Sequence, residues 1–197
     1  FRANDIKNNG EGAPLTPVYH KLLVKKFQIN NPTLILNIGG ISNYTYCFND
    51  TLAAKDIGPG NVLMDEYLKK TKGIDYDKNG DIASSGNINK DIINQFYEHE
   101  FYNVQKKHSF DRNEFDFSFV KGLEFEDAVA TLTYFTALII SQNIKKNFDN
   151  EIEIILCGGG RKNLTLLNHI KKLLKYKIKL IDEFSVDGDF IESQAFA

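Results

Sequence analysis

The sequence has few cysteines, almost no net charge and no long apolar run, and each shortage excludes a class of protein. Cys47 and Cys157 both lie within apolar, strand-like segments, which favours a reducing compartment over a disulfide framework. The formal net charge is −2 with acidic and basic residues interspersed, so no basic face for nucleic acid or anionic lipid is expected. No apolar stretch reaches the roughly 18 residues of a membrane span. The composition predicts a soluble, cytoplasmic protein.

The sequence also lacks an initiator methionine and the common nucleotide-binding signatures. Neither a Walker sequence nor G-x-G-x-x-G occurs, which argues against a P-loop or a dinucleotide-binding fold. With 197 residues, 42% of them hydrophobic, the chain can bury the core of one domain. It opens abruptly with the letters FRANDIKNNGEGAPL, as a globular domain rarely does. We therefore expect the C-terminal piece of a longer protein.

Glycines instead gather in three turns that follow apolar segments. The turns read NIGGISN, DIGPGN and CGGGRKN, at residues 37–43, 56–61 and 157–163. Because glycine has no Cβ, such turns let backbone N–H groups approach an anion, and a helix N-terminus adds partial positive charge. Taken alone, Gly39 and Gly40 favour a plain hairpin turn. The repetition at three strand ends predicts a single phosphate-binding crevice.

The order of the predicted elements is three strands, helix, insertion, helix, strand, helix, strand, helix. The strands are expected at residues 33–38, 43–48, 52–56, 151–157 and 177–182. Asn61 is expected to cap a helix over the letters VLMDEYLKK, and a long buried helix follows Glu124. Strands joined by long helices pair in parallel. The sequence therefore predicts an α/β fold with a mixed five-stranded sheet flanked by helices, the order of the ribonuclease-H-like half-domain of the actin-like ATPase and sugar-kinase superfamily.

Residues 73–120 are predicted to form a polar, partly helical insertion within a single domain over residues 1–197. The letters KDIINQFYEHEFY look helical, and polar stretches flank them. The letters DYDKNGD match the first positions of a calcium loop, but Ser85, Gly86 and Asn87 stand where its closing glutamate belongs. The four histidines share no metal-ligand spacing. Neither calcium nor a histidine metal site is expected.

Five segments resemble one known family, the anhydro-N-acetylmuramic acid kinases. In chain order they read FRANDIKNNGEGAPLTPVYH, NIGGISN, DIGPGNVLMD, CGGGRKN and GDFIESQAFA. The resemblance is co-linear and spans nearly the whole chain. Other members of the superfamily are not expected to share GAPLTP together with ESQAFA. The chain is therefore similar to the C-terminal half of this family.

The resemblance implies an ATP-dependent sugar kinase of peptidoglycan recycling. Water opens 1,6-anhydro-N-acetylmuramic acid at the anomeric carbon, and the released O6 takes the γ-phosphoryl group, which gives N-acetylmuramic acid 6-phosphate and ADP. A carboxylate must accept the proton of the water, and Mg²⁺ must offset the phosphate charge. In the family this carboxylate precedes the Phe-Arg pair, so the base is expected just before Phe1. The chain alone is expected to be inactive, because the N-terminal phosphate loop belongs to the other half.

The resemblance also implies a set of ATP-binding residues in the three glycine turns. Asn163 has two interpretations, binding of the ribose or capping of the helix that follows it, and capping is favoured. The implied set is Gly39, Gly40, Asn43, Gly58, Gly60, Asn61, Gly158, Gly159, Gly160 and Asn163.

Four charged residues are candidates for the sugar and metal side of the site. Arg2 and Glu192 are the implied substrate-binding residues, with a solvated terminal side chain and a helix N-terminal charge as the respective alternatives. Asp56 precedes Gly-Pro-Gly, where it can hold Mg²⁺-bound water and take part in catalysis, or fix the turn through backbone N–H groups. Asp5 is a substitute base in principle, although a turn or capping role is favoured.

A non-catalytic module is the alternative hypothesis, because a fold alone does not fix function. On that hypothesis the chain binds nucleotide and the insertion at residues 73–120 binds a partner. The kinase hypothesis predicts ATP, a small amino sugar and the N-terminal half of the same protein as partners, with a homodimer implied by the family resemblance.

Overall fold

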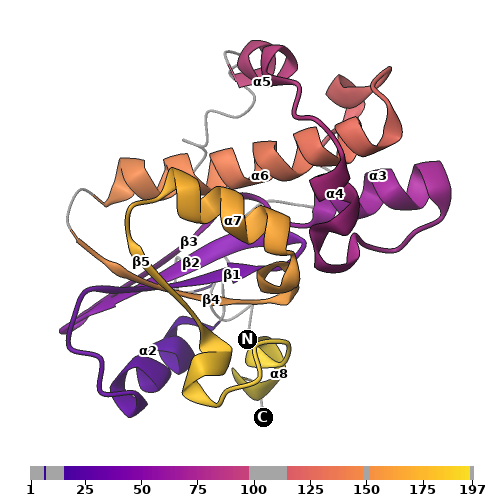
Figure 1. Ribbon diagram of the computed structural model, residues 1–197. Helices are drawn as coiled ribbons and strands as arrows, with labels where there is room; N and C mark the ends of the chain where they lie inside the picture. Colours follow the sequence, from indigo (N-terminus) through magenta and orange to yellow (C-terminus); the bar gives the residue numbers. More distant parts are fainter. Residues whose placement is uncertain (1–6, 8–15, 98–114, 149–150, 196–197) are drawn as a thin grey trace.

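A mixed five-stranded sheet forms the centre of the structure, a computed structural model that describes residue 7 and residues 16–97, 115–148 and 151–195. The strands lie in the order β3-β2-β1-β4-β5 (Figure 1). β1 to β3 form an antiparallel meander, while β4 pairs in parallel with both β1 and β5. The predicted fold class is confirmed. The strands are β1 (Thr33–Ile38), β2 (Ile41–Phe48), β3 (Thr51–Pro59), β4 (Glu153–Cys157) and β5 (Lys177–Leu180).

Alternate residues of the central strands pack into two cores, one on each face of the sheet. Leu34 and Leu36 of β1 belong to the larger core, and Ile35 between them belongs to the smaller one. In β4, Leu156 joins the larger core and Ile155 the smaller. Both strands are buried along their whole length and are mostly apolar, as expected for central strands covered on both faces.

Helices α3, α6 and α7 lie on the face of the larger core (Figure 1). α6 (Phe125–Asn147) is the predicted long helix, and most of its central residues are buried. α3 (Val62–Lys72) follows β3 directly, and α7 (Leu164–Leu173) connects the parallel strands β4 and β5. In the described part of the chain, no helix combines the length and apolarity that a membrane span requires.

The opposite face carries α2 (Pro17–Lys26) and the short α8 (Ile191–Ala195) (Figure 1). α2 is a helix that sequence analysis did not anticipate. It buries His20, Leu23 and Val24 at helical spacing, but Val18 and Leu22 are 67% and 59% exposed. These exposed apolar side chains blur the amphipathic pattern from which a helix is inferred.

The described part of the predicted insertion packs against α6. Its helices are α4 (Asp81–Ser85) and α5 (Lys90–Tyr97), preceded by the 3₁₀ turn η1 (Lys78–Gly80), and a further 3₁₀ turn, η4, spans Ser118–Val120. The backbone N–H of Asn87 donates to Asp127 Oδ1 of α6 at 2.7 Å. The last residues of the helix predicted over 90–102 lie outside the described part.

Candidate functional site

The first two glycine turns contact each other at the end of the β1–β2 hairpin. The carbonyl oxygen of Gly39 accepts the N–H of Asn61 at 2.8 Å, and that of Gly40 accepts the N–H groups of Gly60 and Val62 at 2.8 and 3.2 Å. A Cβ on Gly60 would overlap the Gly39 carbonyl oxygen. We call this contact the hairpin–helix junction. It engages N–H groups at the start of α3 that sequence analysis expected to face an anion.

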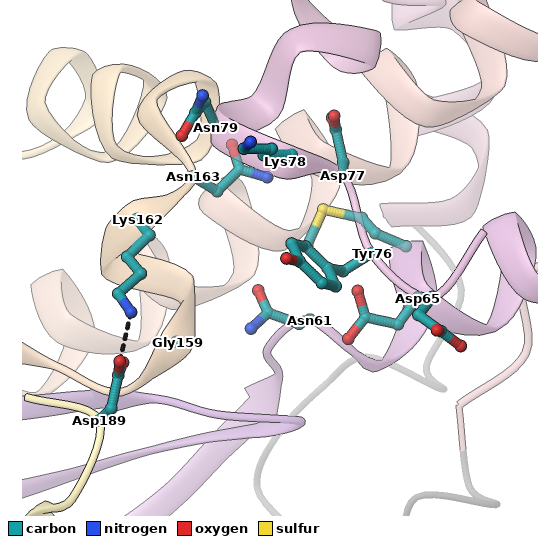
Figure 2. A pocket seen from close by; sticks show the side chains of 12 residues that line it. Asn61, Asp65, Tyr76, Asp77, Lys78, Asn79, Gly159, Lys162, Asn163 and Asp189 are labelled. Carbon is teal, nitrogen blue, oxygen red and sulfur yellow. Dashed lines mark hydrogen bonds and ion pairs between the residues drawn. The ribbon is translucent and has the colours of Figure 1, made fainter.

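Asn61 does not cap α3 as predicted. It stands at the N-cap position, but its side chain makes no capping hydrogen bond, and its own N–H bonds to the hairpin carbonyl of Gly39. The side chain instead faces a pocket (Figure 2). Asn163 does cap α7, since its Oδ1 accepts the N–H of Leu166 at 2.9 Å. It lines the same pocket.

The third turn contains three glycines with three different surroundings. Gly158 has φ +80°, and a Cβ there would overlap Asn37 Oδ1. A Cβ on Gly160 would overlap the Ile38 side chain. At Gly159 a Cβ would have ample space, because its nearest neighbour would be Asn61 Nδ2 at 3.8 Å. Gly159 is therefore the one of the three whose Cα faces open space at the pocket.

The pocket has a volume of about 440 Å³, within the range of small-molecule sites. The start of α3 and the segment before η1 form one side, and the triple-glycine turn with the start of α7 forms the other (Figure 2). Lys162 and Asp189 form an ion pair at its edge. Its lining residues are Asn61, Met64, Asp65, Asp75, Tyr76, Asp77, Lys78, Asn79, Gly159, Lys162, Asn163 and Asp189.

Arg161 holds the triple-glycine turn in place, and sequence reasoning missed it. Its side chain is only 4% exposed and forms two hydrogen bonds with Asp182, at 2.6 and 2.8 Å. It also donates to Asp189 at 2.6 Å and to the Gly158 carbonyl at 3.0 Å. The hydrogen bond to Asp182 raises the pKa of Arg161, and the hydrogen bonds from Arg161 lower the pKa of the Asp182 and Asp189 carboxyl groups. The signal available was the cluster of acids in the letters IDEFSVDGD.

A row of polar residues crosses the sheet on the face that carries α2 and α8. Asn43 of β2 lies opposite Asn37 of β1 on one side and opposite Asp56 of β3 on the other. Asp56 is 8% exposed and Asn37 is 7% exposed. We call these three residues the polar row. It brings together two of the predicted residues, Asn43 and Asp56, next to the hairpin tip.

His20 lies on the same face as the polar row. Its Nδ1 is 2.7 Å from Thr45 Oγ1, and burial lowers its pKa to about 4. Its Nε2 makes no hydrogen bond. A neutral histidine is therefore part of this face at physiological pH.

The remaining predicted residues occupy separate places. Gly58 has φ +133°, and a Cβ there would overlap the Ile139 side chain, so packing against α6 accounts for this glycine. Glu192 belongs to α8, on the polar-row face. Its side chain lies outside the described part, as do Arg2 and Asp5.

The polar row fits Mg²⁺ as a partial site. Mg²⁺ takes one or two carboxylates and completes its shell with water and phosphate oxygens. Asp56 with Asn43 beside it offers oxygens of that kind. Within the described residues, no three His, Cys, Asp or Glu side chains come together to hold a metal on their own. In the calcium-like letters DYDKNGD, Asp77 accepts two backbone N–H groups, which supports a structural role for that residue.

The sheet order, the glycine turns and the pocket beyond the ends of β3 and β4 define the class of the domain by its fold, which is ribonuclease-H-like, as in actin-like ATPases. Two solved structures share this fold. The activator of the 2-hydroxyisocaproyl-CoA dehydratase from Clostridium difficile, with bound ADPNP, matches with TM-score 0.51 and 15% identity over 83% of this chain and 57% of that one. Component A of the Acidaminococcus fermentans (R)-2-hydroxyglutaryl-CoA dehydratase matches with TM-score 0.52 and 9% identity over 84% and 60%.

The chain belongs to the anhydro-N-acetylmuramic acid kinase family, whose model matches residues 1–197. The relative from Pelagibacter ubique is 49% identical over 100% of this chain and 55% of its own length. The relative from Zymomonas mobilis is 37% identical over 100% of this chain and 54% of its own length. Both are named anhydro-N-acetylmuramic acid kinase. The chain therefore spans about half the length of the curated relatives it matches.

Proposed function

We propose that the chain is the ATP-binding, C-terminal part of a cytoplasmic kinase that opens 1,6-anhydro-N-acetylmuramic acid and phosphorylates its O6 in peptidoglycan recycling. The observation that carries this proposal is the convergence of Asn61, Gly159 and Asn163 on one pocket at the strand ends. These residues come from two separate motifs that resemble the family, DIGPGNVLMD and CGGGRKN. Membership of the family supports the same assignment.

The two sides of the sheet divide the substrates in this proposal. The nucleoside occupies the pocket, and its phosphates pass the open face of Gly159 toward the end of the β1–β2 hairpin. The amino sugar lies on the side of the polar row, where Asp56 and α8 with Glu192 are placed. The triple-glycine turn separates the two, so a bulky side chain there would obstruct the path of the phosphates.

The proposed reaction consists of two coupled bond changes. The water oxygen bonds to the anomeric carbon while the C1–O6 bond breaks, and O6 bonds to the γ-phosphorus while the bond to the ADP oxygen breaks. The proton of the water goes to a carboxylate that we place just before Phe1. Asp56 would hold Mg²⁺ through water, and the bound ion would offset phosphate charge. The N-terminal half supplies the rest of the phosphate clamp, so the isolated chain is inactive, and a homodimer is the assembly proposed by resemblance.

Labelled water tests the proposal in the full-length protein. With anhydro-N-acetylmuramic acid and ATP in oxygen-18 water, mass spectrometry of the sugar phosphate should find the label at the anomeric hydroxyl. The phosphoryl group should carry none, because its bridging oxygen comes from O6. Label in released inorganic phosphate without sugar phosphate would indicate an ATPase that does not act on the sugar, and would contradict the proposed kinase activity. Turnover by residues 1–197 alone would contradict the assignment of the base to the missing half.

A further inference from the structure

We propose that the ring of Tyr76 is the platform on which the nucleobase stacks, an inference that rests on the proposed function. Tyr76 lines the pocket and is 62% exposed. In Figure 2 its ring stands in the pocket, with Asn61 on one side and Asn163 on the other. It is the one aromatic side chain among the described lining residues. A large exposed aromatic surface in a pocket is a site where a flat, apolar ligand face gains contact area.

The backbone on both sides of the pocket fixes the position of Tyr76. The next residue, Asp77, is 6% exposed, and its carboxylate accepts the N–H groups of Ile82 and Ala83 at 2.9 and 3.0 Å. On the far side of η1, the Gly80 carbonyl accepts the hydroxyl of Thr165 of α7 at 2.8 Å. The segment that carries Tyr76 is therefore tied to both α4 and α7, so its backbone needs little ordering when a ligand binds.

The charges around the pocket orient a nucleotide with its base toward Tyr76. Asp65 and Asp75 line the same side as the ring, and negative side chains disfavour phosphate groups there. Gly159 lies on the opposite side, where its open backbone leaves room for phosphates, and the carboxylate of Asp189 there is neutralised by its ion pair with Lys162.

The two asparagine side chains complete this orientation. Asn61 and Asn163 lie between the acidic side and the glycine side, and their amides can hydrogen-bond base edges or ribose hydroxyls. Tyr76 thus supplies the stacking surface, and the amides supply polar recognition.

The test measures ATP affinity and both Michaelis constants in the full-length protein. Tyr76→Ala should weaken ATP binding roughly 5- to 150-fold, the range of base–aromatic stacking. Tyr76→Phe should retain near-parental affinity, because it keeps the ring face. Ile74→Ala is the matched control, since it trims an exposed apolar side chain on the same segment that does not line the pocket. Thermal denaturation should show all three variants folded, because both side chains are exposed.

A fluorescence measurement reports stacking directly. The chain contains no tryptophan, so Tyr76→Trp introduces a new indole signal that is read as the difference from the parent protein. ATP should quench this signal, and inorganic triphosphate should not.

Several outcomes would overturn the inference, and they differ from failure of the proposed function. If the parent protein binds ATP but Tyr76→Ala binds it equally well, the platform assignment is wrong. A raised KM for the sugar with an unchanged KM for ATP would assign the ring to the sugar instead. An unquenched indole in a variant that binds ATP would also contradict stacking. If the parent protein itself fails to bind ATP, the proposed function is wrong.

Discussion

The hairpin–helix junction and the triple-glycine turn look alike in sequence and serve different purposes in the structure. At the junction the carbonyls of Gly39 and Gly40 bond to the start of α3, and Gly60 allows the two backbones to touch. At the triple-glycine turn, Gly158 and Gly160 fit against β1, whereas Gly159 faces space. Glycine thus permits internal backbone contact at the first site and leaves room for a ligand at the second. The surroundings of each glycine, rather than its presence, indicate its role.

The largest expected effect is at the junction. Gly60→Ala places a Cβ against the Gly39 carbonyl, and a backbone oxygen cannot rotate away as a side chain can. We expect a loss of about 3 kcal/mol or more in the free energy of unfolding. Urea denaturation would measure it, with Gly159→Ala as the control, since an added Cβ there meets nothing closer than Asn61 Nδ2 at 3.8 Å. A stable Gly60→Ala protein would mean that the junction opens at little cost.

The triple-glycine turn should separate stability from binding. Gly159→Val should weaken ATP binding about 100-fold, equivalent to ~2.7 kcal/mol, while the protein stays folded, because the new side chain enters the pocket and not the core. Gly160→Val should do the reverse, since its Cβ overlaps Ile38 and overpacking costs about 1–3 kcal/mol of stability. Calorimetry with ATP and thermal denaturation of both variants make the comparison. Unchanged ATP affinity in Gly159→Val would show that the nucleotide does not bind in this pocket.

The sheet and its main helices could be predicted from local patterns. Residues 33–38 form a strand because a short, largely apolar run is typical of a strand buried on both faces. The gap-free apolar pattern after Glu124 similarly predicted α6. These elements are determined by residues that are close together in the sequence, so they can be predicted from it. Helix α2 could not be predicted from its amphipathic pattern, because its solvent face is also apolar at Val18 and Leu22.

The site was less predictable because long-range contacts determine it. Asn61 has the residue type and position of a helix cap, but its side chain makes no capping bond, and its backbone N–H bonds to the carbonyl of Gly39 in the preceding hairpin. Arg161 reads as one more basic residue until Asp182 and Asp189 are seen around it. Tyr76 belongs to a polar stretch that contacts α7 through Gly80. No local sequence pattern predicts this contact. Pairing across the sheet, which places Asn43 beside Asp56, likewise depends on register.

The smallest expected effect is a pH dependence of stability that arises at the triple-glycine turn and not at the hairpin–helix junction. The junction is held by backbone hydrogen bonds, whereas the triple-glycine turn depends on Arg161 and its carboxylates. Hydrogen bonds from Arg161 and Lys162 lower the pKa of Asp189 below its ordinary 3.8. A carboxyl with a lowered pKa binds fewer protons when folded than when unfolded. Its contribution is therefore complete well above pH 3.8 and is lost as the pH falls through the folded value.

Asp189→Asn tests this response. The variant should be less stable than the parent protein at pH 7, by under about 1 kcal/mol because Asp189 is partly exposed, and the difference should shrink toward zero below pH 3.8. His20, whose pKa is lowered to about 4, destabilises both proteins equally between pH 6.5 and 4 and cancels in the difference. Asp50→Asn is the control, since Asp50 lies 4.0 Å from Lys21 in a fully exposed pair and should change nothing. Urea titrations across pH give the difference directly. If it stays constant from pH 7 to 3, the charge on Asp189 does not hold the triple-glycine turn, and packing around Arg161 is sufficient.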